Sequence, residues 1–157
     1  MNRNMLAIAA TCFAGLALAL SAGAQQASDI EAVKAANQSF YKALSARDAK
    51  AMEAVWAKKP YVTNVGPSNK MIAVGYADAV SQYWPKAFDE MSKIAVTSTV
   101  AQVQSDGKIA WVVGTEAADL QTKGGQSLRF NIIVTNIFEK DGERWLMVSH
   151  HALPIPK

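Results

Sequence analysis

The clearest hydrophobic pattern lies near the C-terminus, between Leu128 and Ala152. Two runs rich in β-branched and aromatic residues flank the dipeptide Asp141-Gly142 there. An Asp-Gly pair between two such runs is a strong hairpin signal, because both residues tolerate the positive φ of a type I′ turn. The pattern therefore predicts two antiparallel strands joined by a two-residue turn, with Ile132 facing His151.

Side chains of a strand alternate between the two faces of a sheet, so this register sorts the hairpin residues. One face is large and apolar with polar groups toward one end, and it consists of Leu128, Phe130, Ile132, Val134, Asn136, Phe138, Trp145, Met147, Ser149 and His151. We expect it to form the inner wall of a core that opens into a pocket. The other face is also fairly apolar and consists of Arg129, Asn131, Ile133, Thr135, Ile137, Leu146, Val148 and His150. We expect a second copy of the chain to cover that face, giving a homodimer through the sheet.

Helical periodicity dominates the region before the first strand. Apolar residues recur at helical spacing over residues 29–46, where Ser28 or Asp29 is placed to cap the N-terminus of a helix. Asp48 is a second N-cap candidate, and the shorter helix that it begins extends to Trp56.

The middle of the chain predicts a small hairpin and then an aromatic helix. Residues 61–65 form a strand candidate, and residues 71–74 follow a turn as its pairing partner. Helical spacing resumes at Tyr76, with a break or kink expected at Pro85 because proline lacks the backbone N–H. This helix could lid a cavity, but for any single one of its aromatic residues we favour plain core packing.

Two longer strands follow, over residues 93–104 and 108–120, around a second two-residue turn at Asp106-Gly107. In that register Thr97 faces Glu116. Helices followed by four long meandering strands predict an α+β fold, with a curved antiparallel sheet wrapped around the N-terminal helices.

Residues 1–24 resemble a secretory signal peptide. A charged start precedes an apolar run from Met5 to Leu20, and Ala22-Gly23-Ala24 matches an A-x-A cleavage site. We expect cleavage after Ala24 and a single periplasmic or secreted domain over residues 25–157.

Composition narrows the chemistry of that domain. The single cysteine of the chain, Cys12, lies in the signal segment, which excludes a disulfide or a thiolate site from the mature domain. The net charge is +3 with Lys and Arg scattered among acids, so we expect no nucleic-acid partner and no membrane attachment after cleavage. No zinc-helix, phosphate-loop or dinucleotide motif occurs, and we expect neither a metal nor a cofactor.

The second half of the chain resembles a known family in four segments: Ala110–Gly114, Arg129–Asn131, Phe138–Gly142 and Trp145–Ala152. They are similar to SnoaL-like members of the nuclear transport factor 2-like (NTF2-like) superfamily, and the likeness extends over about residues 29–153. The resemblance implies a cone-shaped α+β barrel, usually a homodimer, with a pocket between the curved sheet and the helices. Family members include isomerases, cyclases and dehydratases as well as proteins that only bind or scaffold.

The ketosteroid isomerase branch of that superfamily implies a specific pair of residues. Its oxyanion-holding tyrosine corresponds to Phe40 here, and its aspartate base corresponds to Asn64. Phenylalanine cannot donate a hydrogen bond and an amide does not take a proton at neutral pH. Tyr41 is adjacent to Phe40, but one residue turns a side chain by about 100° around a helix. Ketosteroid-type proton transfer with these groups is therefore not expected.

The hairpin supplies the first candidate for chemistry, His151. On the predicted inner face it accompanies Asn136 and Ser149, and the reference pKa of histidine, about 6.5, suits a general base. The alternative is a structural histidine hydrogen-bonded at the end of the strand. We place His150 on the outer or dimer face. Adjacent strand residues point to opposite faces, so the two histidines do not chelate one metal unless the strand bulges.

Glu116 is a second candidate with two possible positions. Inward and buried, it would have a raised pKa and act as an acid or base; outward, it would be a solvated charge, which we favour. Arg129 and Asn131 either pair across an oligomer interface or with Glu116, or anchor a carboxylate. Further residues expected at the cavity are Trp56, Tyr61, Asn64, Tyr83 and Trp84.

Three functions remain open on the sequence alone. The first is binding of a small, largely apolar molecule without catalysis. The second is an isomerase, cyclase or lyase that uses His151 as general base, with Asn64 or Tyr61 polarising a carbonyl. The third is a homo-oligomeric scaffold module that assembles through the outer sheet face.

Overall fold

The computed structural model follows the predicted order of helices and strands. It describes the backbone of residues 5–156 and the side chains of residues 23–156, so the charged start of the signal segment and the side chain of Cys12 lie outside the described part. The helical elements are α1 (Met5–Ala46), α2 (Ala49–Val55), the π-helical turn η1 (Ala77–Ser81) and α3 (Tyr83–Glu90). The strands are β1 (Thr63–Val65), β2 (Ala73–Val74), β3 (Met91–Ser105), β4 (Ile109–Thr122), β5 (Ser127–Asp141) and β6 (Arg144–Pro154).

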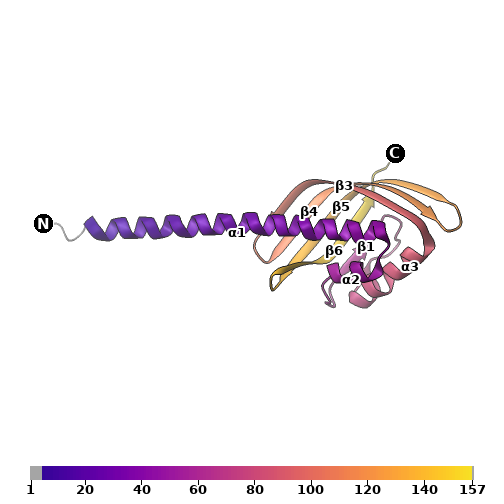
Figure 1. Cartoon of the computed structure of the whole chain (residues 1–157), viewed down its shortest axis with the longest axis horizontal. Helices are drawn as coiled ribbons and strands as arrows, with labels where there is room; N and C mark the ends of the chain where they lie inside the picture. Colours follow the sequence, from indigo (N-terminus) through magenta and orange to yellow (C-terminus); the bar gives the residue numbers. More distant parts are fainter. Residues whose placement is uncertain (1–4, 157) are drawn as a thin grey trace.

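The six strands form one curved sheet in the order β2-β1-β6-β5-β4-β3. All neighbouring pairs are antiparallel except β1 and β6, which run parallel. Figure 1 shows the sheet arching over the C-terminal half of α1, with α2 and α3 on the same side. The sheet does not close, because β2 and β3 remain as its two edges. The predicted α+β architecture with a curved, mostly antiparallel sheet around the helices is confirmed.

Helix α1 presents one face to the sheet and projects beyond it at its N-terminal end (Figure 1). Asp29, Val33, Asn37 and Phe40 are buried, at the spacing of three to four residues that places side chains on one helix face. The expectation that Ser28 or Asp29 caps a helix is wrong, since α1 runs continuously through both. The buried carboxylate of Asp29 instead accepts a hydrogen bond of 2.7 Å from Lys140 Nζ of β5. Within the described residues, no helix has the length and apolar character needed to span a membrane.

Helix α2 begins as predicted. The side chain of Asp48 accepts a hydrogen bond from the backbone N–H of Ala51 at 2.9 Å, which satisfies one of the unpaired donors of the first turn. Pro85 behaves differently from the prediction, because no break occurs at it. The change from η1 to α3 falls at Gln82, and Pro85 lies in the first turn of α3, where its missing N–H has no intrahelical partner to lose.

The C-terminal hairpin differs from the predicted register. Asp141 pairs with Arg144, so the two-residue loop consists of Gly142 and Glu143 rather than Asp141 and Gly142. Gly142 has φ of +61° at the first loop position, the position that requires glycine in a type II′ turn. The register of the β3–β4 hairpin is also shifted, since Glu116 faces Ser98 instead of Thr97.

Three register shifts interrupt the strand pairing, and the first lies between Met91 and Lys93 at the start of β3. The other two bend the sheet and change which residues face inward. One lies between Val100 and Gln102 of β3, and the other lies in β6, where Ile137 pairs with Ser149 but Phe138 pairs with Met147. An extra residue in one strand locally increases twist and reverses the inward and outward alternation beyond it. The predicted inner face of β5 is confirmed by the burial of Ile132, Val134, Asn136 and Phe138.

Candidate functional site

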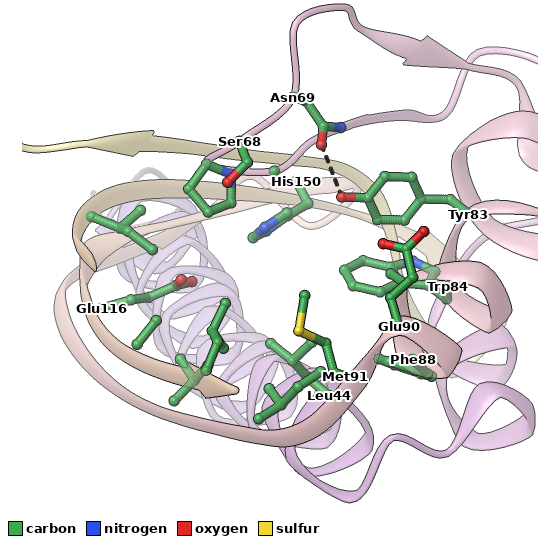
Figure 2. A pocket seen from close by; sticks show the side chains of 18 of the residues that line it. Leu44, Ser68, Asn69, Tyr83, Trp84, Phe88, Glu90, Met91, Glu116 and His150 are labelled. Atoms are coloured by element: carbon green, nitrogen blue, oxygen red, sulfur yellow. Dashed lines mark hydrogen bonds between the residues drawn. The ribbon is translucent and has the colours of Figure 1, made fainter. Parts of the chain in front are cut away.

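A cavity of about 350 Å³ lies between the concave face of the sheet and helix α3. Its walls are mainly apolar and are contributed by α1, α3 and strands β3 to β5: Leu44, Trp84, Phe88, Ile94, Val96, Ala118, Leu120 and Ile132. Such a space is at the lower end of the range of about 300 to 1,000 Å³ that holds small organic ligands. Figure 2 shows Glu116 and His150 reaching into it from the sheet, with Trp84 and Phe88 on the side of α3.

The entrance of the cavity is polar. Ser68, Lys86 and Glu90 line the cavity and are exposed to solvent, so they mark its mouth. The loop that follows β1 is held against α3 by a hydrogen bond of 3.0 Å from the hydroxyl of Tyr83 to the side-chain oxygen of Asn69 (Figure 2). The mouth therefore combines both charge signs, whereas Glu116 and His150 are the acidic and basic side chains that are buried among the described lining residues.

Glu116 is the first of these interior groups. Only 6% of its surface is exposed, and its carboxylate accepts a hydrogen bond of 2.6 Å from the hydroxyl of Tyr41 on α1. Burial raises the pKa of Glu116 above its usual range, and the Tyr41 hydrogen bond opposes that rise in part. Burial, with the neighbouring Glu116 carboxylate, also raises the pKa of Tyr41, so the phenol stays protonated. Glu116 is thus a carboxyl group whose protonated form is favoured by its surroundings.

Asn136 of β5 joins this pair to the second interior group. Its Nδ2 donates to Asn37 Oδ1 of α1 at 2.8 Å and lies 3.4 Å from the Tyr41 hydroxyl. Its Oδ1 lies 2.7 Å from Nδ1 of His150. Because Asn37 and Tyr41 are four residues apart on α1, both side chains lie on the helix face that meets the sheet. Together, these contacts join five buried side chains into one network: Asn37, Tyr41, Glu116, Asn136 and His150.

His150 is the second interior group. Burial, together with the neighbouring His151, lowers the pKa of His150 to about 3, so its ring is neutral at physiological pH. Since Asn136 Oδ1 can only accept, Nδ1 of His150 carries the proton and donates it in that hydrogen bond. The ring packs 4.9 Å from the ring of Phe40. With Nδ1 occupied, Nε2 is left with a lone pair at the edge of the cavity.

The two histidines occupy faces opposite to those predicted. His151 faces Thr135 on the outer side of the sheet and is exposed, whereas His150 faces Asn136 and is buried. The cause is the irregularity in β6, where Val148 is the extra residue and shifts every later side chain to the other face. The placement of His151 on the inner face was therefore wrong, and so was the placement of His150 on the outer face.

Glu116 also lies on the side that we did not favour. Alternate residues of β4, from Ala110 through Val112 to Ala118, are buried, and Glu116 belongs to this inward series. Trp111 is 40% exposed and belongs to the outward series. The preference for an outward Glu116 was wrong because the larger aromatic residue, not the carboxylate, faces away from the helices.

The remaining predicted cavity residues divide into two groups. Tyr83 and Trp84 line the cavity as expected. The others lie outside the cavity lining. Trp56 is 2% exposed in the core, and Tyr61 is exposed and donates a hydrogen bond to Glu139. The hydroxyl of Ser149 accepts a hydrogen bond from Thr63, and Asn136 is buried and hydrogen-bonded to His150.

Asn64 does not reach the cavity either. It is fully buried, and its Nδ2 donates to the backbone oxygen of Ala79 at 3.1 Å. Asn64, Glu116 and His151 therefore do not converge on one point. Arg129 is exposed and lies 3.6 Å from Asp119 on the outer side of the sheet, remote from Glu116.

The sequence reasoning missed Asn37, Tyr41 and His150 as site residues. A usable signal existed for the first two, because polar side chains four residues apart interrupt the apolar face of α1. A buried polar group needs a partner, so this interruption indicated a polar group on the facing sheet.

Comparison with known proteins agrees with the fold. The SnoaL-like domain family matches residues 33–155. F-box protein SKIP8 from Arabidopsis thaliana is 29% identical over 126 residues, which are 77% of this chain and 48% of that protein. The chain thus spans about half the length of this curated relative.

Two solved structures are also similar. One is a proposed calcium/calmodulin-dependent protein kinase type II association domain from Thiobacillus denitrificans, with 27% identity, a TM-score of 0.66, and coverage of 78% of this chain and 94% of that one. The other is a proposed dehydratase of the NTF2-like family from Streptomyces avermitilis, with 23% identity, a TM-score of 0.73, and coverage of 83% and 99%. At that identity the second likeness shows the fold alone.

Proposed function

Because the chain belongs to the SnoaL-like domain family, we propose that its cavity binds a small, largely apolar molecule between the sheet and α3. The observation that supports this most is the apolar wall around two buried, hydrogen-bonded polar groups, Glu116 and His150. Convergent polar groups in an apolar cavity are typical of sites that orient a small ligand. A polar network of five hydrogen-bonded residues is also preorganised, which reduces the free energy needed to order the site on binding.

The test uses a panel of neutral bicyclic aromatic and alicyclic compounds and measures the thermal unfolding temperature of residues 25–157. A ligand present at about 100 times its Kd stabilises a folded protein by about 2.7 kcal/mol, which is readily detected. The variant Ala118→Leu places extra side chain in the cavity, and we expect it to weaken binding at least tenfold. The matched control is Ala117→Leu, on the outer face of the same strand, which should bind as the wild type does. No stabilisation by any compound, or equal binding by the two variants, would contradict the proposal.

A second candidate function is proton transfer on a carbonyl compound held in this cavity. It is favoured by the raised pKa of Glu116, because burial makes this carboxylate a better proton acceptor than an exposed one. Glu116 replaces His151 in this role, since His151 is exposed on the outer face of the sheet.

Exchange of the α-hydrogens of 2-tetralone with D₂O, followed by proton NMR, tests this activity. We expect enzyme-dependent exchange with the wild type and a loss of at least about 100-fold with Glu116→Gln, the usual contribution of a general acid or base. Equal exchange with both proteins would remove the catalytic candidate and leave the binding proposal in place.

A further inference from the structure

Among the described residues that line the cavity, His150 presents an acceptor, and Trp84 carries a buried indole N–H that has no hydrogen-bond partner. Asn136 uses its Oδ1 to accept from His150 Nδ1 and its Nδ2 to donate toward Asn37 and Tyr41. These contacts assign the ring proton of His150 to Nδ1 and leave Nε2 able only to accept. In the same way, the Tyr41 hydroxyl donates to Glu116, so that contact adds no free donor to the cavity.

Among the described lining residues, no buried cationic side chain accompanies these groups. Lys86 is the one Lys or Arg among the described lining residues, and it is exposed at the mouth beside Glu90. A bound carboxylate would meet the lone pair of His150 and the carboxyl group of Glu116, without a buried cation to pair with it. An unpaired charge in an apolar site is costly to desolvate.

We propose that the cavity recognises an uncharged, apolar molecule through a hydroxyl group that donates a hydrogen bond to Nε2 of His150, and that it rejects carboxylates. This inference rests on the proposed binding function and specifies the chemical class of its ligand. The wall residues bury the hydrocarbon part, and His150 fixes the orientation of the hydroxyl end. A ligand without a donor leaves Nε2 desolvated and unpaired, which is the basis for discrimination.

The protonation preferences of the two interior groups agree with this class. Burial lowers the pKa of His150 and raises the pKa of Glu116, so the cavity disfavours the charged form of each group. A site that disfavours its own charges offers little to stabilise a charged ligand.

Three probes of nearly equal size separate the possibilities by isothermal titration calorimetry at pH 7 with residues 25–157. They are 2-naphthol, which has a donor; 2-methoxynaphthalene, which lacks it; and 2-naphthoate, which is anionic. We expect 2-naphthol to bind at least about tenfold more tightly than 2-methoxynaphthalene, and 2-naphthoate to bind most weakly.

The binding results distinguish an error in the ligand class from an error in the binding function. If 2-methoxynaphthalene binds as tightly as 2-naphthol, or if 2-naphthoate binds best, the ligand class is wrong while the binding function stands. If none of these probes binds and none of the neutral panel stabilises the protein, the binding function itself is overturned, and this inference with it.

A pair of variants assigns the preference to one ring. His150→Asn keeps an amide N–H near the place of Nδ1, where it can still donate to Asn136, but it removes the acceptor at Nε2. We expect it to lose about tenfold in affinity for 2-naphthol and little for 2-methoxynaphthalene, so that the two probes bind alike. His151→Asn is the matched control on the exposed face, and it should keep the wild-type preference. Retained preference in His150→Asn would contradict the assignment.

The ring itself provides a readout that does not depend on any ligand or on the folding of a variant. Nitrogen-15 NMR of the histidine rings distinguishes a protonated from an unprotonated nitrogen. We expect His150 to show the Nδ1–H form, with Nε2 unprotonated at pH 7. The opposite form would mean that Asn136 presents its amide nitrogen to the ring and that Nε2 is a donor, which would overturn the proposal.

Discussion

At the scale of single residues, the buried ring of His150 ties protein stability to pH. Its pKa falls from 6.5 to about 3 on folding, mainly because the cationic ring would be desolvated. In the unfolded chain this ring therefore binds a proton below about pH 6.5, whereas in the folded chain it does so only below about pH 3. Stability arising from this group is present above pH 6.5 and is lost as the pH falls, by up to about 1.4 kcal/mol per pH unit.

Over part of that pH range, Glu116 changes the folding stability in the opposite direction. Its folded pKa is raised from 4.5, so the folded chain holds a proton that the unfolded chain releases. Stability from this group is present below about pH 4.5 and decreases as the pH rises through the folded pKa. The two opposing contributions make the pH dependence of the wild type shallower than that of either group alone.

The first prediction separates these contributions by urea unfolding at pH 7, 6 and 5 in a Glu116→Gln background. We expect the free energy of unfolding to decrease by about 1 to 2 kcal/mol from pH 7 to pH 5 because of His150. Adding His150→Asn should remove most of this decrease, whereas adding the exposed-face change His151→Asn should leave it in place. An unchanged pH slope in the His150→Asn protein would show that the ring is not buried as a neutral group.

At the scale of elements, the single extra residue in β6 decides the composition of the site. Val148 is itself 9% exposed and packs into the core, so the bulge is stabilised by apolar burial and not only tolerated. Without the bulge, β6 would alternate regularly and present His151 to the cavity. The bulge also adds curvature at the place where β6 pairs with both β5 and the parallel strand β1.

The curvature of the neighbouring strands depends on a close backbone approach. A side chain at Gly114 of β4 would place its Cβ 2.3 Å from the backbone oxygen of Thr99, beside the irregularity in β3. Only glycine fits this contact without movement of the backbone. The bend in turn brings Glu116, two residues further along β4, over helix α1.

Only the C-terminal part of helix α1 makes side-chain hydrogen bonds to the strands among the described residues. Among the described residues, the hydrogen bonds between α1 and the strands begin at Gln26, which donates to the backbone of Ser105, and continue with Asp29 and Lys140. Cleavage after Ala24, as the signal-like segment predicts, would leave these contacts intact. The ion pair of Asp29 is nearly buried, and the Lys140 hydrogen bond is the main cause that lowers the pKa of that carboxyl.

The second prediction concerns these contacts and compares two purified chains, residues 25–157 and residues 31–157, by urea unfolding. The shorter chain loses Asp29 and leaves Lys140 half-buried without its partner, so we expect it to be less stable by about 1 to 3 kcal/mol. The control is Lys34→Ala in the longer chain, which removes the exposed pair with Glu31 and should cost less than about 0.5 kcal/mol. Equal stability of the two chains would show that the Asp29 contact is not structural.

At the scale of the whole molecule, the outer face of the sheet is more apolar than a solvated surface requires. Ile133 and Leu153 face each other there on neighbouring strands and are 52% and 53% exposed, and Trp111 lies on the same side. These residues belong to the three central long strands rather than to an edge. An exposed apolar face can pack against the same face of a second copy about a twofold axis, which is how most soluble dimers form.

The third prediction is that residues 25–157 form a homodimer through this face, measured by sedimentation velocity at about 10 μM. We expect the double variant Trp111→Lys with Ile133→Lys to sediment as a monomer, because like charges would then oppose each other across the twofold axis. The matched control is Ile72→Lys, an exposed apolar residue beside β2, which should remain dimeric. A monomeric wild type would contradict the prediction directly.

Local sequence patterns were sufficient to predict the order of helices and strands and the α+β architecture. Runs of β-branched and aromatic residues separated by Asp-Gly dipeptides predicted four consecutive antiparallel strands, and helical spacing with Asp48 predicted the helices. These signals depend on the backbone preferences of neighbouring residues, so they can be recognised in one sequence. They also supported the resemblance to the SnoaL-like family, which the match over residues 33–155 confirms.

The tertiary structure alone decided which polar residues meet. Whether Glu116 points toward the helices depends on which face of β4 is covered by α1, and whether His150 or His151 does so depends on one extra residue in β6. Both are properties of segments far apart in the sequence, and a shift by one residue reverses them. The network of Asn37, Tyr41, Glu116, Asn136 and His150 exists because burial demands a partner for each polar group, and the partners are supplied by α1, β4, β5 and β6 together.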